Sequence, residues 1–380
     1  MIIPYGKQRI DSKDIRTINK VLKSDFLTQG PMVKEFEKQL KRKLYAKYAT
    51  VVNNGSSALL AIGKILNWKR GDLIAVPPIT FLSSVNTIEH CGAKPIFIDI
   101  NLKDYCMDPN ILEKALQKDK NKNIKAAIIV DYGGQPAQWD KFLSLKRKYN
   151  IKLVNDNCHA LGSSFHNNKG YAVKYADLVS LSFHPVKAIT TGEGGAILTN
   201  NLKYEKKAKI LRTHGIIREK KHWKYSMREI GYNFRLPDIN CALGISQIKK
   251  LDKFIKKRKK IAKIYDKHFY DKKKFVVPKK IINSENSYHL YPLLLNLNKI
   301  KKTKDMIIKE FLKCGIKLQV HYIPVNTQPY YKKKYGFNKK NFKNTISFFK
   351  RCVSLPIFYE LNTNKISYIK KICNKVLKNQ

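Results

Sequence analysis

The sequence predicts an α/β fold with a large, mostly parallel sheet and a smaller α/β part toward the C-terminus. Between residue 50 and about residue 240, short apolar runs alternate with longer amphipathic stretches, as strands and helices do in such folds. Apolar residues make up 43% of the 380 residues, so a large core can form and global disorder is not expected. No apolar run approaches the roughly 18 residues that span a bilayer, which argues against a membrane protein.

The N-terminal third begins with two predicted helices. The first covers residues 14–23 and leads into a turn at residues 27–31. The second is indicated by Val33, Phe36, Leu40 and Leu44, whose spacing places them on one helix face.

Five apolar runs are the strand candidates of the alternating region. They are residues 73–76, 96–99, 126–131, 151–155 and 178–183. Ligands bind at the carboxyl ends of parallel strands, so chemically active residues are expected directly after these runs.

The pattern changes after Asn240. We expect a long basic helix over residues 245–265, then strands at 288–297 and 316–322 mixed with helices. The chain is therefore divided into an N-terminal arm and substrate loop (1–30), a large cofactor-binding domain (31–250) and a small C-terminal domain (251–380).

A formal charge of +48 is the largest deviation in the composition. It could indicate a protein that binds nucleic acid or an anionic membrane. However, 65 of the basic residues are Lys and only 11 are Arg, and they are spread over nearly the whole chain. A nucleic-acid reader would cluster its charge and favour Arg for base contacts. We therefore expect neither nucleic acid nor membrane as a partner, and instead a solvated surface that attracts anionic substrates such as a nucleotide sugar.

The seven cysteines predict a reducing compartment. They are odd in number and widely spaced, and no two form a CxxC pair. This pattern favours free thiols over a disulfide framework or a zinc site, so no metal is expected. The first residues also lack the apolar stretch of a signal peptide. Both observations predict a cytoplasmic protein.

A phosphate site is predicted where a short strand enters the stretch Asn54-Gly55-Ser56-Ser57. Gly55 permits a turn, and the following helix begins with two hydroxyl side chains. Free N–H groups at a helix N-terminus suit a phosphate group. A plain N-cap is the more common role of Ser in this position, and it remains an alternative.

Two other strand ends carry candidate residues. Asp156 closes an apolar run and His159 follows three residues later. A carboxylate there could hold a cationic ring nitrogen, although a helix cap or a surface position explains it as well. Phe81 follows the run 73–76 and could stack on a flat cofactor, but an isolated Phe more often belongs to the core.

Residues 182–195 hold the strongest candidate. Ser182 ends a strand, a His-Pro turn follows, and Lys187 stands among apolar neighbours ahead of three glycines. A desolvated amine has a lowered pKa and can attack an aldehyde. The glycines do not form GxGxxG after a strand, so a dinucleotide loop is not expected. A phosphate cradle, a stacking aromatic, an acid and an amine together form the set that pyridoxal 5'-phosphate (PLP) requires.

With these motifs in place, the sequence resembles the DegT-type family of nucleotide-sugar aminotransferases. The likeness runs over almost the whole chain, through residues 25–31, 54–57, 156–162, 182–187 and 231–235. It implies the fold-type I architecture of PLP-dependent transferases, similar to aspartate aminotransferase. It also implies a homodimer with shared active sites, in which Asn233 reaches the phosphate bound in the neighbouring subunit.

The resemblance assigns the remaining roles. Lys187 would bond to the cofactor aldehyde and Asp156 would face the ring nitrogen. Phe81 would stack on the ring, with His159 beside it. The phosphate would be held by Gly55, Ser56, Ser57 and Ser182.

Within the family, the likeness is strongest to aminotransferases of pseudaminic acid synthesis, through residues 130–134, 184–191, 289–292, 320–324 and 354–356. It implies transfer of an amino group from L-glutamate to C4 of a UDP-linked 4-keto-6-deoxy-N-acetyl-L-hexosamine. A bacillosamine- or perosamine-type aminotransferase remains an alternative. Some relatives are dehydratases with His in place of the lysine, and Lys187 argues against that reaction. Candidates for sugar selection are Leu27, Thr28, Gln29, His214, His321 and Tyr322.

Overall fold

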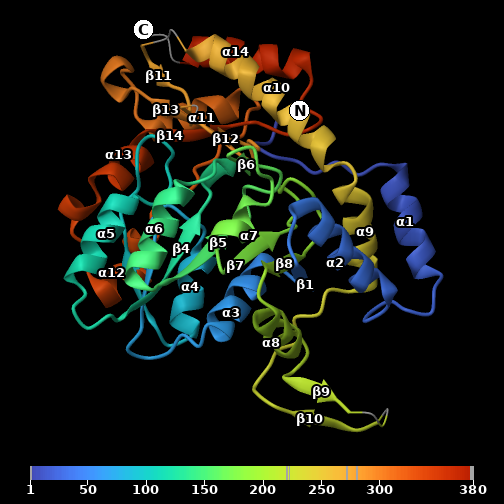
Figure 1. The fold of residues 1–380 in the computed structure, drawn as a ribbon. Coiled ribbons are helices and arrows are strands. Elements are labelled where there is room, and N and C mark those ends of the chain that lie inside the picture. Colours follow the sequence, from blue (N-terminus) through green and yellow to red (C-terminus); the bar gives the residue numbers. More distant parts are fainter. Residues whose placement is uncertain (1, 220, 222, 271–272, 280, 377–380) are drawn as a thin grey trace.

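The computed structural model describes residues 2–219, 221, 223–270, 273–279 and 281–376. A seven-stranded sheet forms the centre of the molecule, and a three-stranded sheet lies beyond one end of it (Figure 1). The helices are α1 (Ser12–Leu22), α2 (Pro31–Leu44), α3 (Gly55–Ile65), α4 (Leu82–His90), α5 (Pro109–Lys118), α6 (Trp139–Tyr149), α7 (Tyr171–Tyr175), α8 (Leu202–Arg212), α9 (Asp238–Ile248), α10 (Leu251–Phe269), α11 (Lys304–Lys313), α12 (Pro329–Tyr335), α13 (Lys343–Arg351) and α14 (Thr363–Val376). The strands are β1 (Tyr48–Val52), β2 (Leu73–Val76), β3 (Lys94–Phe97), β4 (Ile124–Val130), β5 (Lys152–Asp156), β6 (Ser164–Phe165), β7 (Leu178–Ser182), β8 (Gly195–Thr199), β9 (Ile216–Arg218), β10 (Tyr225–Met227), β11 (Phe275–Val276), β12 (Ser284–Glu285), β13 (Tyr291–Leu295) and β14 (Cys352–Leu355).

The large sheet has the strand order β1-β8-β7-β5-β4-β2-β3. All neighbouring pairs from β7 to β3 are parallel, whereas β8 runs antiparallel to both of its neighbours. The prediction of a mostly parallel sheet is therefore confirmed. The five predicted strands are β2, β3, β4, β5 and β7, with β3 starting and ending two residues earlier than expected.

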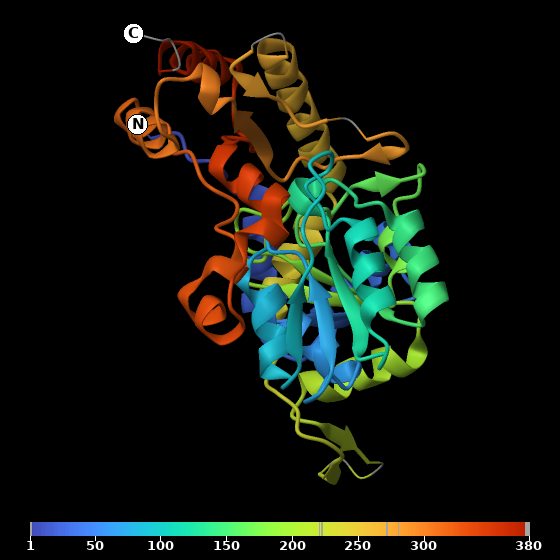
Figure 2. The same ribbon diagram turned by 90° about the vertical axis from the view of Figure 1, so that its left-hand side faces the viewer.

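Helices cover both faces of this sheet (Figure 2). Alternate strand residues point to opposite faces, so each strand contributes to two cores. Ile74 and Ile128 join the core under α3, α4 and α8. Ala75 and Ile129 join the core under α2, α5, α6 and α9. Because the parallel strands are buried on both faces, they appear in the sequence as continuous apolar runs.

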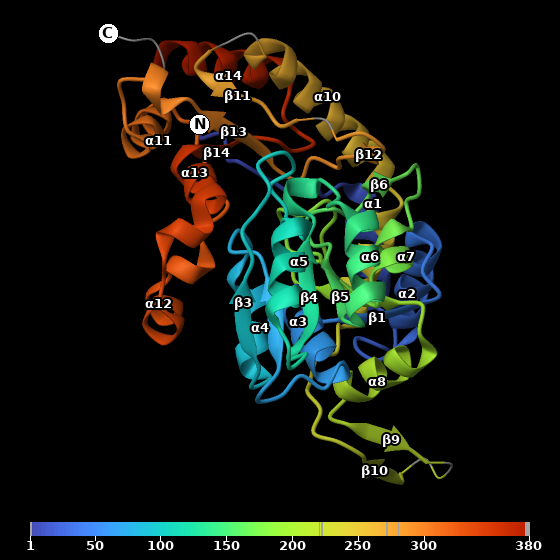
Figure 3. The ribbon, with the colours of Figure 1, turned by 60° about the vertical axis from the view of Figure 1, so that its left-hand side comes forward.

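The C-terminal part is built on the antiparallel sheet β11-β13-β14. Its core includes Tyr265 and Phe269 of α10, Phe311 of α11 and Ile369 of α14. Figure 3 shows α13 and α12 descending from this part toward β3 and α4. Tyr331 of α12 donates its hydroxyl to Asn86 of α4 at 2.6 Å, which fixes the descending segment against the large sheet. The domain boundary near residue 250 stays a prediction.

Two predicted elements are wrong. The helix expected over residues 245–265 is two helices, α9 and α10, interrupted at Lys249 and Lys250. At this interruption the Lys250 amine binds the carboxylates of Asp11 and Asp14. The strand expected over residues 316–322 is only an extended segment. It changes partner along its length, pairing first with Ile3 and then with Ser354, so no continuous ladder forms.

The turn at residues 27–30 is held by a buried carboxylate. Asp238, at the start of α9, accepts hydrogen bonds from the N–H groups of Gly30 (2.8 Å) and Met32 (2.9 Å). It is fully buried and also lies in the first turn of its own helix, where a negative charge is favoured. Asp238 therefore connects the N-terminal end of α2 to the first turn of α9.

Replacing Asp238 by Ala is expected to lower the free energy of unfolding by about 2–4 kcal/mol, because two buried N–H donors lose their acceptor. Urea denaturation measures this change. The control is Asp252→Ala, which removes exposed ion pairs with Lys43 and Lys169 and should cost less than about 1 kcal/mol. Equal losses in the two variants would contradict the proposed role of Asp238.

Candidate active site

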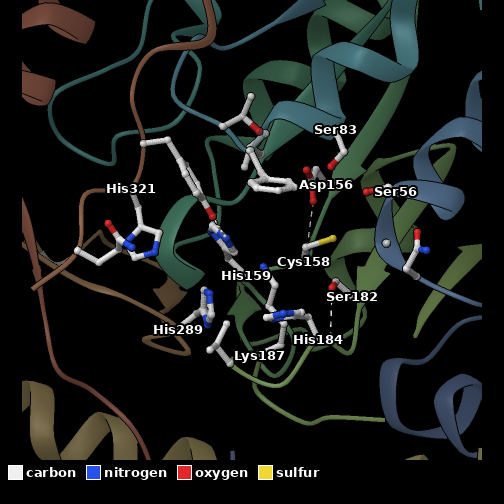
Figure 4. A pocket seen from close by; sticks show the side chains of 18 of the residues that line it. Ser56, Ser83, Asp156, Cys158, His159, Ser182, His184, Lys187, His289 and His321 are labelled. Atoms are coloured by element: carbon white, nitrogen blue, oxygen red, sulfur yellow. Dashed lines mark hydrogen bonds between the residues drawn. The ribbon is translucent and has the colours of Figure 1, made fainter. Parts of the chain in front are cut away.

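A cavity of about 710 Å³ opens at the carboxyl edge of the large sheet. It is lined by residues that follow β1, β2, β5 and β7, and by the extended segment at residues 319–322 (Figure 4). Of the residues predicted from sequence, the cavity brings together Gly55, Ser56, Phe81, Asp156, His159, Ser182, Lys187, His321 and Tyr322.

Asp156 is the last residue of β5, and its side chain is almost completely buried. Ser84 of α4 donates its hydroxyl to one carboxylate oxygen at 2.7 Å. The N–H of Cys158 donates to the other oxygen at 3.2 Å. Thr80 in turn lies within hydrogen-bond distance (2.8 Å) of the Ser84 hydroxyl. The carboxylate is thus fixed at a strand end, and it faces the cavity.

Lys187 lies in the turn that follows β7 and is half-buried. Its N–H donates to the carbonyl of His184, which closes the turn. Within the described part of the chain, the Lys187 amine has no hydrogen-bond or ion-pair partner. Burial lowers the pKa of this amine, although nearby Cys158 and Asp156 oppose the shift. The amine therefore loses its proton more readily than a surface lysine does.

The N-terminus of α3 forms a concave wall of the cavity. Asn54 caps this helix by accepting a hydrogen bond from the N–H of Ser57 at 2.8 Å. A side chain at Gly55 would bring a Cβ within 2.9 Å of the Cβ of Ser182, and one at Gly195 would meet the Asn54 carbonyl at 2.5 Å. Glycine is thus required for β7, β8 and α3 to approach so closely, and the approach leaves N–H groups beside two serine hydroxyls.

His159 is held in one tautomer. The N–H of Gly133 donates to its Nδ1 at 3.3 Å, and its Nε2 lies 2.9 Å from the Tyr322 hydroxyl. Burial, reinforced by Lys187 and His321, brings the pKa of His159 well below its usual value. The ring is therefore neutral at physiological pH.

Two more buried histidines, His289 and His321, line the same cavity (Figure 4). The His289 ring packs against that of His159, tilted by 37° with a centroid separation of 4.4 Å, and its buried Nδ1 has no partner among the described residues. His321 Nδ1 lies 2.9 Å from the Ser354 hydroxyl. Burial and the Lys187 charge lower the pKa of His321 to about 3. Three imidazoles of lowered pKa, those of His159, His289 and His321, thus share one cavity with the Lys187 amine.

Phe81 is not part of the core. It is the N-cap residue of α4, it is 53% exposed, and its ring lies 6.0 Å from that of Tyr322. A large apolar ring that faces a cavity is available to cover a flat ligand.

The other predicted residues lie outside the cavity of this single chain. Ser57 is buried, with its N–H used by Asn54. His214 and Asn233 lie at the base of the β9–β10 hairpin, and both are exposed. The two chain segments that enter and leave the hairpin pass very close to each other. A Cβ at Gly215 or Gly231 would collide with the backbone of the other segment, so both positions require glycine. The turn that contains Leu27, Thr28 and Gln29 lies on the surface, and Gln29 lines a separate, smaller cavity near Arg235.

The sequence interpretation missed the residues that support the site. Ser84 and Thr80 hold the Asp156 carboxylate, Gly133 orients His159, and His289 packs on it. Two signals were available in the sequence. Thr80 and Ser84 come soon after a predicted strand, and Gly133 and His289 lie in stretches 130–134 and 289–292, which carry the family resemblance.

The fold and this cavity define a fold-type I transferase. The chain belongs to the DegT/DnrJ/EryC1/StrS aminotransferase family, whose sequence profile matches residues 8–376. It is 39% identical over 376 residues to the UDP-4-amino-4,6-dideoxy-N-acetyl-beta-L-altrosamine transaminase of Campylobacter jejuni, covering 99% of this chain and 98% of that protein. The protein of the same name from Helicobacter pylori is 34% identical over 98% of this chain and 96% of its own length.

Solved structures agree with these sequence relatives. Helicobacter pylori PseC, described as an aminotransferase involved in the biosynthesis of pseudoaminic acid, superposes with a TM-score of 0.92. It is 32% identical, and the match covers 99% of both chains. A putative sugar aminotransferase from Streptococcus pneumoniae, solved in its PLP-form, has a TM-score of 0.89 and 28% identity over 100% of both chains.

Proposed function

We propose that this protein is a PLP-dependent transaminase that moves an amino group from L-glutamate to C4 of a UDP-linked 4-keto-6-deoxy-N-acetyl-L-hexosamine, a step of pseudaminic acid biosynthesis. The main support is that an unpartnered amine, Lys187, and a fixed carboxylate, Asp156, line one cavity. The names of the relatives at 34–39% identity support the choice of sugar.

The residues of the cavity fit PLP. A volume of about 710 Å³ leaves room for the cofactor and part of a substrate. Lys187 would bind the aldehyde and Asp156 the ring nitrogen, while Phe81 covers one ring face. The wall of Gly55, Ser56 and Ser182 would take the phosphate, where a Cβ at Gly55 would intrude.

Each residue then has a defined task. Bound PLP supplies the electron sink that transamination needs. Asp156 keeps the proton on the ring nitrogen, and the hydrogen bonds from Ser84 and Cys158 prevent its carboxylate from turning away. Lys187 would hold the cofactor aldehyde, and once free its neutral amine would take the proton from the donor carbon and return it at the acceptor carbon.

The deciding experiment is a transamination assay with L-glutamate over a panel of UDP-, dTDP- and GDP-linked 4-keto sugars. The proposal expects the highest kcat/KM with the UDP-linked 4-keto-6-deoxy-L-hexosamine. Preference for a D-configured UDP sugar would favour the bacillosamine-type alternative. Preference for a GDP-linked sugar would favour the perosamine-type, named for a relative that is 28% identical. A colourless protein that cannot be loaded with PLP and binds DNA in a salt-sensitive way would favour a nucleic-acid-binding protein.

We further propose that the enzyme is a homodimer with shared active sites. The β9–β10 hairpin projects from the body of the protein (Figure 1). It and the chain after it carry the exposed apolar residues Trp223, Tyr225, Met227 and Ile230. Four such side chains on one small arm favour a protein partner. A second copy fits this role, since Asn233 and His214 at the base of the arm lie outside the cavity of their own chain.

Replacing Met227 by Glu is expected to weaken the dimer by placing a charge in an apolar contact. Analytical ultracentrifugation measures the dissociation constant, which should rise at least about tenfold if the charge costs 1.4 kcal/mol or more. The control is Ile282→Glu, at another exposed apolar residue away from the arm. A dimer that dissociates equally in both variants would refute this interface.

The reaction is proposed to take place in the cytoplasm. None of the seven cysteines, all of which lie in the described part of the chain, forms a disulfide, and five of them are buried, which suits a reducing compartment. Among the described residues, no helix is long and apolar enough to cross a membrane.

A further inference from the structure

The Tyr322 hydroxyl stands at the end of a directed chain of hydrogen bonds. Gly133 donates its N–H to Nδ1 of His159, and Nε2 of His159 lies 2.9 Å from the hydroxyl oxygen of Tyr322. A backbone N–H can only donate, so Nδ1 is the acceptor and the neutral ring carries its hydrogen on Nε2. His159 therefore donates to Tyr322, and the hydrogen of the Tyr322 hydroxyl must point elsewhere.

That hydrogen has no protein acceptor in the described part of the chain, since the contact with His159 is the only hydrogen bond found for this hydroxyl. Three rings hold the phenol in place. The His321 ring lies edge-on 5.0 Å away, the His159 ring is stacked 5.9 Å away at 22°, and the Phe81 ring lies 6.0 Å away. Because Tyr322 lines the cavity, its free O–H is available to a ligand there.

The hydroxyl also keeps its hydrogen. Burial raises the pKa of Tyr322 well above the usual value, and the Asp156 carboxylate adds to this shift. Tyr322 is therefore a donor over the whole physiological pH range.

We propose that Tyr322 donates its hydroxyl hydrogen to the phenolic oxygen of bound PLP, and that His159 is the positioning residue that aims it. This inference rests on the proposed PLP chemistry. The phenolic oxygen stands on the ring carbon next to the one that carries the aldehyde, so it would share a proton with the lysine nitrogen bonded there. A donor to that oxygen stabilises its anionic form and makes the shared proton easier to remove.

The test is a pH titration of the visible absorption of the PLP-loaded protein. Tyr322→Phe keeps the ring and its packing but removes the donor. The pKa of the chromophore should rise by about one unit or more, because a hydrogen bond to a charged group contributes roughly 1.5–3 kcal/mol. The control is Tyr5→Phe, which removes another hydroxyl from the same cavity without a contact to His159 and should cause no shift. An unchanged pKa in Tyr322→Phe, or an equal shift in Tyr5→Phe, overturns the proposal.

Two variants of His159 test the positioning role and decide the matter if Tyr322→Phe does not retain PLP. His159→Gln keeps an N–H donor and is expected to titrate close to the wild type. His159→Leu removes the donor and should raise the pKa of the chromophore. Equal pKa values for the two variants would refute the proposal. A wild-type protein that cannot be loaded with PLP would instead refute the proposed function itself.

Discussion

Replacing Lys187 by Ala is expected to abolish turnover, with a loss of at least about 10³-fold, because the same amine binds the cofactor and transfers the proton. The nearby imidazoles offer no substitute, because an imidazole cannot form an imine with an aldehyde and because burial lowers the pKa of His159, His289 and His321, which makes them weak bases. PLP added to the variant should no longer be fixed to the protein by borohydride. Absorption spectroscopy and mass spectrometry of the reduced protein measure this.

Two further variants separate the chemistry of Lys187 from its charge. Lys187→Arg keeps a cation but cannot bond to an aldehyde at neutral pH, so it should be as inactive as Lys187→Ala. Lys203→Ala, on the exposed surface of α8, should behave as the wild type. Substantial turnover in Lys187→Arg would mean that the cavity needs only a positive charge at this position.

The parallel sheet could be predicted because each of its strands is recognisable from its own residues. Strands buried on both faces must be apolar throughout, and the residues that end them are set apart by their polarity. Asp156 and Lys187 were recognisable in this way, since each follows an apolar run whose end lies at one sheet edge. Their meeting in one cavity follows from the neighbouring positions of β5 and β7 in the sheet.

The contacts across the cavity could not be predicted, because they depend on the path of the C-terminal part. Tyr322 meets His159 across 163 residues of sequence, and the segment that carries it is positioned by Ile3 and Ser354 rather than by its own apolar pattern. The break between α9 and α10 is similar. Leu251 and Phe254 continue a helical apolar pattern, so the sequence shows no break. At the break, the Lys250 amine binds the carboxylates of Asp11 and Asp14, which are distant in sequence.

Replacing Asp156 by Asn should lower kcat by about 100-fold or more, while PLP still binds. The amide is close to the carboxylate in shape but carries no charge. It therefore cannot stabilise a proton on the ring nitrogen, and loss of a buried charged hydrogen bond of roughly 3 kcal/mol corresponds to that factor. Single-turnover measurements with L-glutamate isolate this step from binding of the sugar.

Ser84 provides the graded control for this prediction. Ser84→Ala leaves the charge of Asp156 but removes the 2.7 Å hydrogen bond to one of its oxygens, so the carboxylate is less well fixed. The loss of kcat should be about tenfold, which corresponds to the roughly 1.4 kcal/mol of a single hydrogen bond. The relative size of the two losses of kcat distinguishes the charge of the carboxylate from its orientation. If Ser84→Ala were as slow as Asp156→Asn, the orientation of the carboxylate would matter more than its charge. If Asp156→Asn kept nearly normal rates, a different acid would have to hold the ring nitrogen.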